Sequence, residues 1–203
     1  DGYTVDEPWH IVAGVSYVRT GDYRLNPEHP PLVKLVVGAA QGEAFVLPPF
    51  APLVEKSQER EWVEDVMFLK NDSDAAQQAT RVSLWIFHGA LLLALGLLLW
   101  RALGLAWAAG ALGFLAIEPT VAAHLPVAMT DLPLALTLAV AVAAAGLLLA
   151  EWRWRWVAAT APFAAQAGAQ SPATSTQQVT RATRMPALDS NIFMFLTVLL
   201  ISN

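Results

Sequence analysis

The residue types most able to do chemistry gather near the start of the chain. Residues 6–10 read Asp-Glu-Pro-Trp-His, and residues 26–31 read Asn-Pro-Glu-His-Pro-Pro. The adjacent carboxylates of Asp6 and Glu7 suit a general base. A glutamate beside a histidine, as at Glu28, is an acceptable ligand pair for Zn²⁺ or Mn²⁺. The two motifs therefore predict a site for acid-base chemistry, for metal binding or for both.

Each motif also has a structural explanation. Asp6 and Glu7 precede a helical pattern over residues 8–20, and acidic residues are favoured at the start of a helix. His10 follows on the same helical face, where it can pair with either acid, join them as a ligand or fill an interfacial position. The segment 26–31 is equally typical of a rigid, proline-rich surface turn. Both interpretations stay open for each motif.

Three long apolar segments predict membrane-spanning helices. They cover residues 82–100, 105–123 and 132–150, and each has about the 20 residues needed to cross the hydrocarbon core. The chain is 56% hydrophobic and 14% charged with a mean hydropathy of +0.46, whereas a soluble domain has about 25% charged residues. We therefore expect an all-α membrane protein with three transmembrane helices within residues 81–157.

The segment that precedes these spans, residues 1–80, carries most of the acidic residues and predicts a large loop outside the membrane. Short interfacial helices are expected over residues 8–20 and 32–40. The second of these contains Lys34, whose side chain we expect to extend toward lipid head groups.

Basic residues predict the orientation of the spans. Arg101 follows the first span, and a pair of arginines among tryptophans follows the third. By the positive-inside rule these two ends are cytoplasmic. Residues 1–80 and the connection at 124–131 then lie on the same, outer side. This topology predicts that Asp131 shares one external pocket with the Asp6-Glu7 pair.

Polar residues in and beside the spans have structural explanations too. Asp131 immediately precedes a span with proline in its first turn, which is typical of a helix N-cap and compatible with a role in chemistry. Glu118 stands before Pro119 inside the second span, which favours a broken helix that lines a polar cavity. We interpret His88, in the first span, as a packing residue.

Several classes of function are excluded by the composition. The net charge of −5 and the lack of a basic run argue against a nucleic-acid partner. The absence of cysteine excludes disulfides, thiolate chemistry and cysteine-based zinc sites. Glycine-rich phosphate loops, serine nucleophile elbows and the HExxH zinc motif do not occur.

Both ends of the chain lead us to expect a fragment. The sequence opens on Asp1-Gly2-Tyr3 as if in the middle of a protein, so we expect a preceding span. Residues 158–203 form an atypical tail rich in Ala, Gln, Thr, Ser and Pro, and its apolar run at 192–201 is too short to span a membrane. Our hypothesis is that the original frame is lost near residue 160, by truncation or frameshift.

Taken together, three groups of residues resemble a known family. They are residues 6–10, residues 21–32 with Lys34, and the run from Glu118-Pro119 through His124 to Thr130-Asp131. They are similar to the N-terminal part of bacterial membrane glycosyltransferases of the GT-C type, the relatives of protein O-mannosyltransferases and aminoarabinose transferases. The resemblance covers roughly residues 3–157, and the sequence departs from many relatives at Leu125-Pro126.

The resemblance implies a partial GT-C fold and a multi-pass enzyme of the bacterial inner membrane. Such an enzyme takes a sugar from a polyprenyl-phosphate carrier held among membrane lipids. It passes the sugar, with inversion, to a protein, lipid or glycan acceptor at the outer face. The sugar and the acceptor stay open. Because this chain lacks the family's first span and most later ones, we expect the fragment alone to be inactive.

The resemblance also assigns roles to individual residues. It maps the catalytic base to Asp6, with Glu7 beside it, and brings Asp131 into the same active site. Glu28 corresponds to a metal ligand of some relatives, so the cofactor, if one is needed, is a divalent Mg²⁺, Mn²⁺ or Zn²⁺ ion. The substrate-binding candidates, which include the cations for the leaving phosphate, are His10, His29, Lys34, Arg81, Glu118 and His124.

The alternative is a non-catalytic membrane protein or transporter fragment, in which Asp6, Glu118 and Asp131 pair with bases during assembly. A transporter should place its key ionisable groups near the midplane of the bilayer. Here the polar cluster is predicted outside the membrane. This difference favours the transferase.

Overall fold

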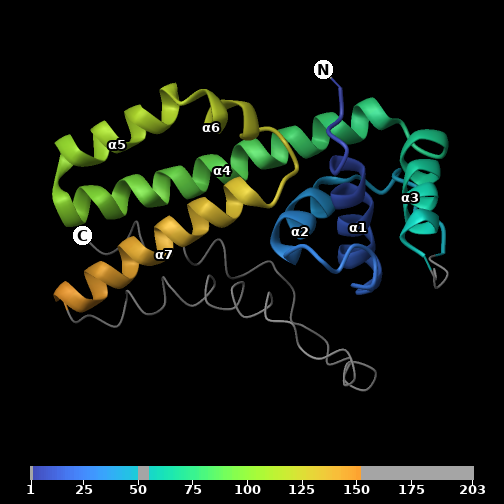
Figure 1. The fold of residues 1–203 in the computed structure, drawn as a ribbon, viewed down its shortest axis with the longest axis horizontal. Helices are drawn as coiled ribbons and strands as arrows, with labels where there is room; N and C mark the ends of the chain where they lie inside the picture. The colour runs from blue at the N-terminus through green and yellow to red at the C-terminus, as the bar shows by residue number, and fades with distance from the viewer. Residues whose placement is uncertain (1, 50–54, 152–203) are drawn as a thin grey trace. The chain divides into compact units, whose positions relative to one another are not determined.

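A computed structural model describes residues 2–49 and 55–151, and all the regular structure in this part of the chain is helical (Figure 1). The all-α prediction is therefore confirmed for the described residues, while the tail at 158–203 lies outside them. The elements are α1 (Glu7–Thr20), α2 (Pro31–Ala40), α3 (Lys56–Glu64), the π-helix η1 (Asp65–Leu69), α4 (Ser73–Leu103), α5 (Leu105–Ile117), α6 (Pro119–His124) and α7 (Asp131–Glu151).

The first two helices cross with their backbones in contact. A Cβ atom added at Gly14 of α1 would overlap the carbonyl group of Lys34, and one added at Gly38 of α2 would overlap the backbone of Gly14. Only glycine at both positions lets the helices approach this closely. The two short helices that the sequence predicts are thus present and pack against each other as one unit, while their place at a membrane interface stays a prediction.

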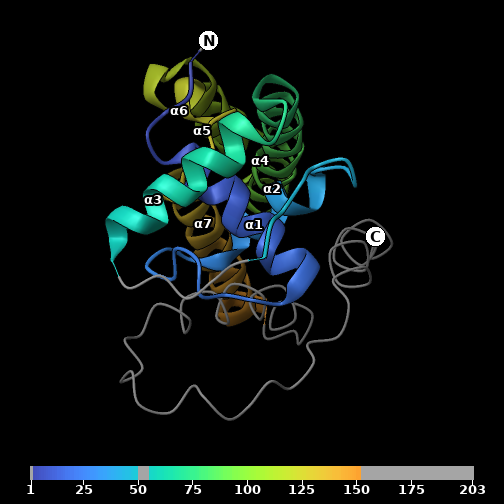
Figure 2. The same ribbon diagram turned by 90° about the vertical axis from the view of Figure 1, so that its right-hand side faces the viewer.

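The helices that precede the apolar part of α4 share an apolar core. Apolar side chains of the helices from α1 to α4 form this core. Burying each of the larger side chains stabilises the fold by about 1.5–3 kcal/mol. α2 contacts both α1 and α4 (Figure 2), and α3 packs on α1. The core includes Ile11, Val12 and Val15 of α1, Val33 and Val37 of α2, Val63 of α3, Val66 and Met67 of η1, and Leu84 of α4.

α4 is longer than the first predicted span. It begins at Ser73, where the carboxylate of Asp72 accepts a hydrogen bond from the N–H of Ala75 at 3.1 Å. Its 31 residues rise about 46 Å, more than the roughly 30 Å of a hydrocarbon core. The additional first turns pack on α2, where the Gln41 amide donates to Thr80 Oγ1 at 3.0 Å. The predicted loop at 1–80 therefore ends in the first turns of α4.

Two helices of the described part, α4 and α7, are long and apolar enough to cross a membrane. The prediction of three spans is not confirmed, because the second predicted span, residues 105–123, is broken at Glu118-Pro119, as the sequence predicts. α5 ends at Ile117 after 13 residues, about 20 Å, and α6 is a separate six-residue helix. The break follows from Pro119, which lacks an N–H and forces Glu118 into an extended conformation at φ −74° and ψ 115°.

α4 and α7 run in the same direction. Their C-terminal ends are joined by an ion pair between Arg101 and Glu151, and both α5 and α7 pack along α4. α5 returns from the Arg101 end, so the residues between α6 and α7 lie at the opposite end of α7, beside the middle of α4 (Figure 1). This is the end that the sequence predicts for the connection before Asp131.

Candidate functional site

Glu7 joins the start of the chain to the residues between α6 and α7, residues 125–130, hereafter the α6–α7 connection. Its side chain is fully buried in the first turn of α1. One carboxylate oxygen accepts a hydrogen bond from the N–H of Thr4 at 2.9 Å, and the other accepts one from the N–H of Ala128 at 3.3 Å. Charge-assisted bonds of this kind are stronger than neutral ones. The carboxylate therefore connects two parts of the chain that are far apart in sequence.

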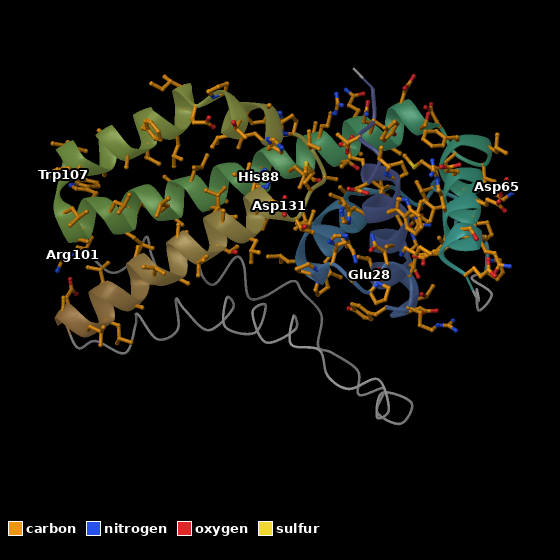
Figure 3. All side chains as sticks on the ribbon, viewed as in Figure 1. Glu28, Asp65, His88, Arg101, Trp107 and Asp131 are labelled. Carbon is orange, nitrogen blue, oxygen red and sulfur yellow. The ribbon has the colours of Figure 1, made fainter. Side chains whose placement is uncertain are left out.

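Two exposed carboxylates flank this bond. Asp6, the residue before Glu7, is exposed, and its side chain makes no capping bond to α1 in the described part of the chain. Asp131 lies three residues after Ala128 and is the exposed first residue of α7 (Figure 3). The α6–α7 connection thus brings Asp131 toward the N-terminal end of α1. Both acids remain accessible for chemistry.

His88 holds the other end of the same connection. It is fully buried in α4, and its Nδ1 lies 2.7 Å from the carbonyl oxygen of Leu125. The sequence indicated packing for His88 and gave no sign of this bond, because its acceptor is a backbone carbonyl 37 residues away.

No protein-family model, curated protein or solved structure matches this chain. What the site can do chemically is therefore argued from its own geometry.

Lys34 faces the protein interior. Its fully buried Nζ donates to the His29 carbonyl at 3.0 Å, to the Tyr17 hydroxyl at 3.2 Å and to the Asn26 carbonyl. Burial lowers the pKa of the Lys34 ammonium to about 8, against the opposing effect of the negative charge of Glu28. The expectation that Lys34 reaches lipid head groups is wrong. Helix α2 turns this position toward the loop that precedes it, and three acceptors compensate the burial of the ammonium.

Glu28 forms an ion pair on the surface. Its half-exposed carboxylate lies 2.9 Å from Lys56 Nζ, which also contacts Glu59 at 3.0 Å and sits 4.3 Å above the Trp9 ring. Burial acts to raise the pKa of Glu28, but the hydrogen bond and charge of Lys56 outweigh it and hold that pKa below its usual value. This carboxylate is therefore charged and already occupied by a cation.

The residues around Glu28 do not form a zinc-type site in the described part of the chain. In residues 2–49 and 55–151, no three His, Asp or Glu side chains come together as a metal-ligand group. Zinc sites take at least three protein ligands, whereas Mg²⁺ is usually held by one or two carboxylates together with substrate phosphates and water. The neighbouring His29 contacts another imidazole instead. Pairing with Lys56 explains the acidic residue at this position equally well.

His10 and His29 form an edge-to-face pair with ring centroids 5.3 Å apart. His10 is buried, and its Nδ1 has no hydrogen-bond partner in the described part of the chain. Burial lowers the pKa of His10 to about 3, helped by the positive charge of Lys34 and by His29. His10 is therefore neutral at physiological pH. Its contact with His29 takes the place of the pairing with Asp6 or Glu7 that the sequence left open.

The remaining candidates make local contacts. Arg81, partly exposed near the start of α4, donates to the carbonyl oxygen of Gly2 at 3.2 Å. The Glu118 carboxylate accepts a hydrogen bond from the N–H of Val121 at 2.7 Å and so caps α6. His124 Nδ1 lies within hydrogen-bond distance, 2.6 Å, of the carbonyl oxygen four residues earlier. Glu118 and His124 therefore have structural tasks in α6. Their predicted contacts with substrate stay predictions.

Proposed function

We propose that this chain forms the acceptor-activating wall of a membrane glycosyltransferase. In this proposal a sugar moves from a polyprenyl-phosphate carrier to a protein, lipid or glycan acceptor at the outer face of a bacterial inner membrane. One observation carries it: the hydrogen bond from Ala128 to Glu7, which brings exposed Asp6 and Asp131 to one end of the helices. The apolar helices α4 and α7 are suited to keep this end beside a bilayer.

Asp6 is the proposed base. Its exposed carboxylate takes the proton of an acceptor hydroxyl or amine while the acceptor atom attacks the anomeric carbon of the sugar. The bond from that carbon to the phosphate oxygen breaks on the opposite face, and polyprenyl phosphate leaves with the electron pair. The configuration at the anomeric carbon is therefore inverted. Asp131, exposed at the start of α7, orients the acceptor through hydrogen bonds.

Glu7 takes a different part from Asp6 in this scheme. Both its carboxylate oxygens accept backbone N–H groups, and the side chain is fully buried. A base must reach the proton that it removes. We therefore assign Glu7 to holding the site together and leave proton transfer to Asp6.

The leaving phosphate needs a positive group nearby. Two cations were candidates from the sequence. Lys34 is fully buried and bonded to loop carbonyls, whereas Arg81 is partly exposed near the start of α4, close to the segment that leads into α1. Arg81 is the better placed of the two. We propose that it contacts the phosphate of the carrier.

The test is transfer by the full-length protein in proteoliposomes that contain a radiolabelled polyprenyl-phosphate sugar. We expect the label to leave the carrier lipid and appear on an acceptor or, slowly, as free sugar. Asp22→Asn is a matched control, because Asp22 pairs with Arg24 in a surface loop and should leave transfer unchanged. A carrier that stays intact across a panel of lipid-linked sugars would overturn the proposal.

A non-catalytic membrane protein is the second candidate, and one observation favours it. Glu7, Lys34 and Glu118 all direct their polar atoms at backbone groups, as residues with a purely structural task do. The two proposed functions predict different effects of substituting Asp6 and Asp131. A structural protein should tolerate asparagine at both positions, whereas the transferase should lose turnover.

A further inference from the structure

We infer that His88 is a positioning residue, which works with Glu7 to hold the α6–α7 connection and thereby places Asp131 at the site. The inference deepens the proposed transfer reaction and rests on it. The evidence is a pair of buried side chains from two different helices that bond to backbone groups only three residues apart, at Leu125 and Ala128.

The bond from His88 has a defined polarity. A carbonyl oxygen can only accept a hydrogen bond, so Nδ1 of His88 is the protonated ring nitrogen. It donates a hydrogen bond to the Leu125 carbonyl oxygen at 2.7 Å. The other ring nitrogen, Nε2, is buried without a hydrogen-bond partner in the described residues. A polar group in an apolar span is costly unless it is bonded. The bond to Leu125 is therefore what offsets the burial of an imidazole at this position.

The α6–α7 connection cannot hold itself in place by its own backbone. Pro126 has no N–H to donate, and the backbone bonds from Val127 to His124 at 3.2 Å and from Met129 to Val127 at 2.9 Å are short-range turns. Anchors from outside are needed to fix it relative to α1 and α4. His88 supplies one from α4, and Glu7 supplies the other from α1.

Fixing this connection fixes Asp131. Thr130 accepts the N–H of Leu134 at 3.0 Å, so the segment passes directly into the first turn of α7. Because few residues separate the anchors from Asp131, little freedom remains between them. Releasing the His88 anchor should let the start of α7 move away from Asp6. Reacting groups that are misplaced by about 1 Å can lose roughly a hundredfold in rate.

The test compares His88→Leu with His88→Asn in the full-length protein in lipid nanodiscs. The asparagine side chain keeps an N–H close to the Nδ1 position, whereas leucine has none. We expect amide hydrogen exchange at residues 127–129 to rise about tenfold in His88→Leu, the effect of losing one buried hydrogen bond. His88→Asn should stay near the wild type. Leu95→Ala, a change of buried packing in the same helix, should leave exchange at 127–129 unchanged.

Enzyme kinetics provide the second readout. His88→Leu should lower kcat with KM for the lipid-linked sugar unchanged, and His88→Asn should restore most of the rate. If His88→Leu does not fold, His88→Gln serves instead, because its amide N–H lies beyond the Nδ1 position and misses Leu125. Unchanged exchange in the folded variant would overturn the inference. A wild type without transfer activity would remove the proposed function while leaving the exchange result to decide the anchor.

Discussion

The Glu7 carboxylate accepts a hydrogen bond from the N–H of Ala128, 121 residues later in the chain, at 3.3 Å. Because Glu7 is buried and its second oxygen is bonded to Thr4, one side chain ties the N-terminal segment, α1 and the α6–α7 connection together. Asp6 stands next to this junction and is exposed. Two adjacent acids thus have different environments and are predicted to have different roles.

The first prediction separates these two acids by stability. Glu7→Ala leaves two backbone N–H groups without their carboxylate partner, so we expect the free energy of unfolding to fall by about 1.5–3 kcal/mol. Asp6→Asn, at an exposed position with no capping bond in the described structure, should stay within about 0.5 kcal/mol of the wild type. Chemical unfolding in detergent, followed by circular dichroism, measures both. Equal losses for the two variants would contradict the assignment.

The second prediction concerns the crossing of α1 and α2. Gly14→Ala places a methyl group against the Lys34 carbonyl of α2, and we expect a destabilisation of about 1–3 kcal/mol from overpacking. Gly89→Ala in α4 is the control, because nothing lies within 4 Å of the added Cβ. There the higher helix propensity of alanine should stabilise the protein by about 0.5–1 kcal/mol. Thermal unfolding of the two variants should therefore shift in opposite directions.

The third prediction uses the low pKa of His10. Burial lowers this pKa from 6.5 to about 3 in the folded protein. Between these two pH values the unfolded chain binds a proton that the folded protein does not, so the stability from His10 is present above pH 6.5 and is lost as the pH falls. His10→Leu should flatten the pH dependence of unfolding between pH 6.5 and 3. His124→Gln, in the short helix α6, should keep it. A steep acid dependence in His10→Leu would contradict the account.

The fourth prediction concerns Lys34 at alkaline pH. Burial lowers its pKa from 10.5 to about 8 on folding. Between these values the unfolded chain still holds the proton that the folded protein has released, so stability should rise with pH across this window. Comparison of the wild type with Lys34→Met isolates the contribution, because the difference in stability between them should change only from pH 8 to 10.5. A constant difference over that range would show that the ammonium is not buried as described.

Sequence periodicity predicted the helices well but not the side-chain partners. The patterns at 8–20 and 132–150 match α1 and α7 to within one residue at each end, because apolar spacing and proline at the first turn are local signals. The break in the second predicted span was also predictable, because Pro119 is a local signal that ends the helix before it. The apolar composition continues to residue 123, but α5 stops at Ile117.

The candidate site was predictable in outline only. Topology predicted that Asp131 lies on the same side of the membrane as Asp6, and this stays a prediction. Burial of Lys34 and the Lys56 partner of Glu28 depend on tertiary contacts that no local pattern records. The bonds of Glu7 and His88 to backbone groups leave no mark on the sequence of the α6–α7 connection, since any residue except proline offers an N–H and every residue offers a carbonyl.

The most direct measurement is sugar transfer by Asp6→Asn in the full-length protein in proteoliposomes. The exposed position of Asp6 means that the variant should fold and insert like the wild type. We predict that turnover falls at least about a hundredfold, the typical contribution of a general base, while the lipid-linked sugar still binds. Turnover at the wild-type rate in folded Asp6→Asn would contradict the role of Asp6 as the base, and with it the central claim.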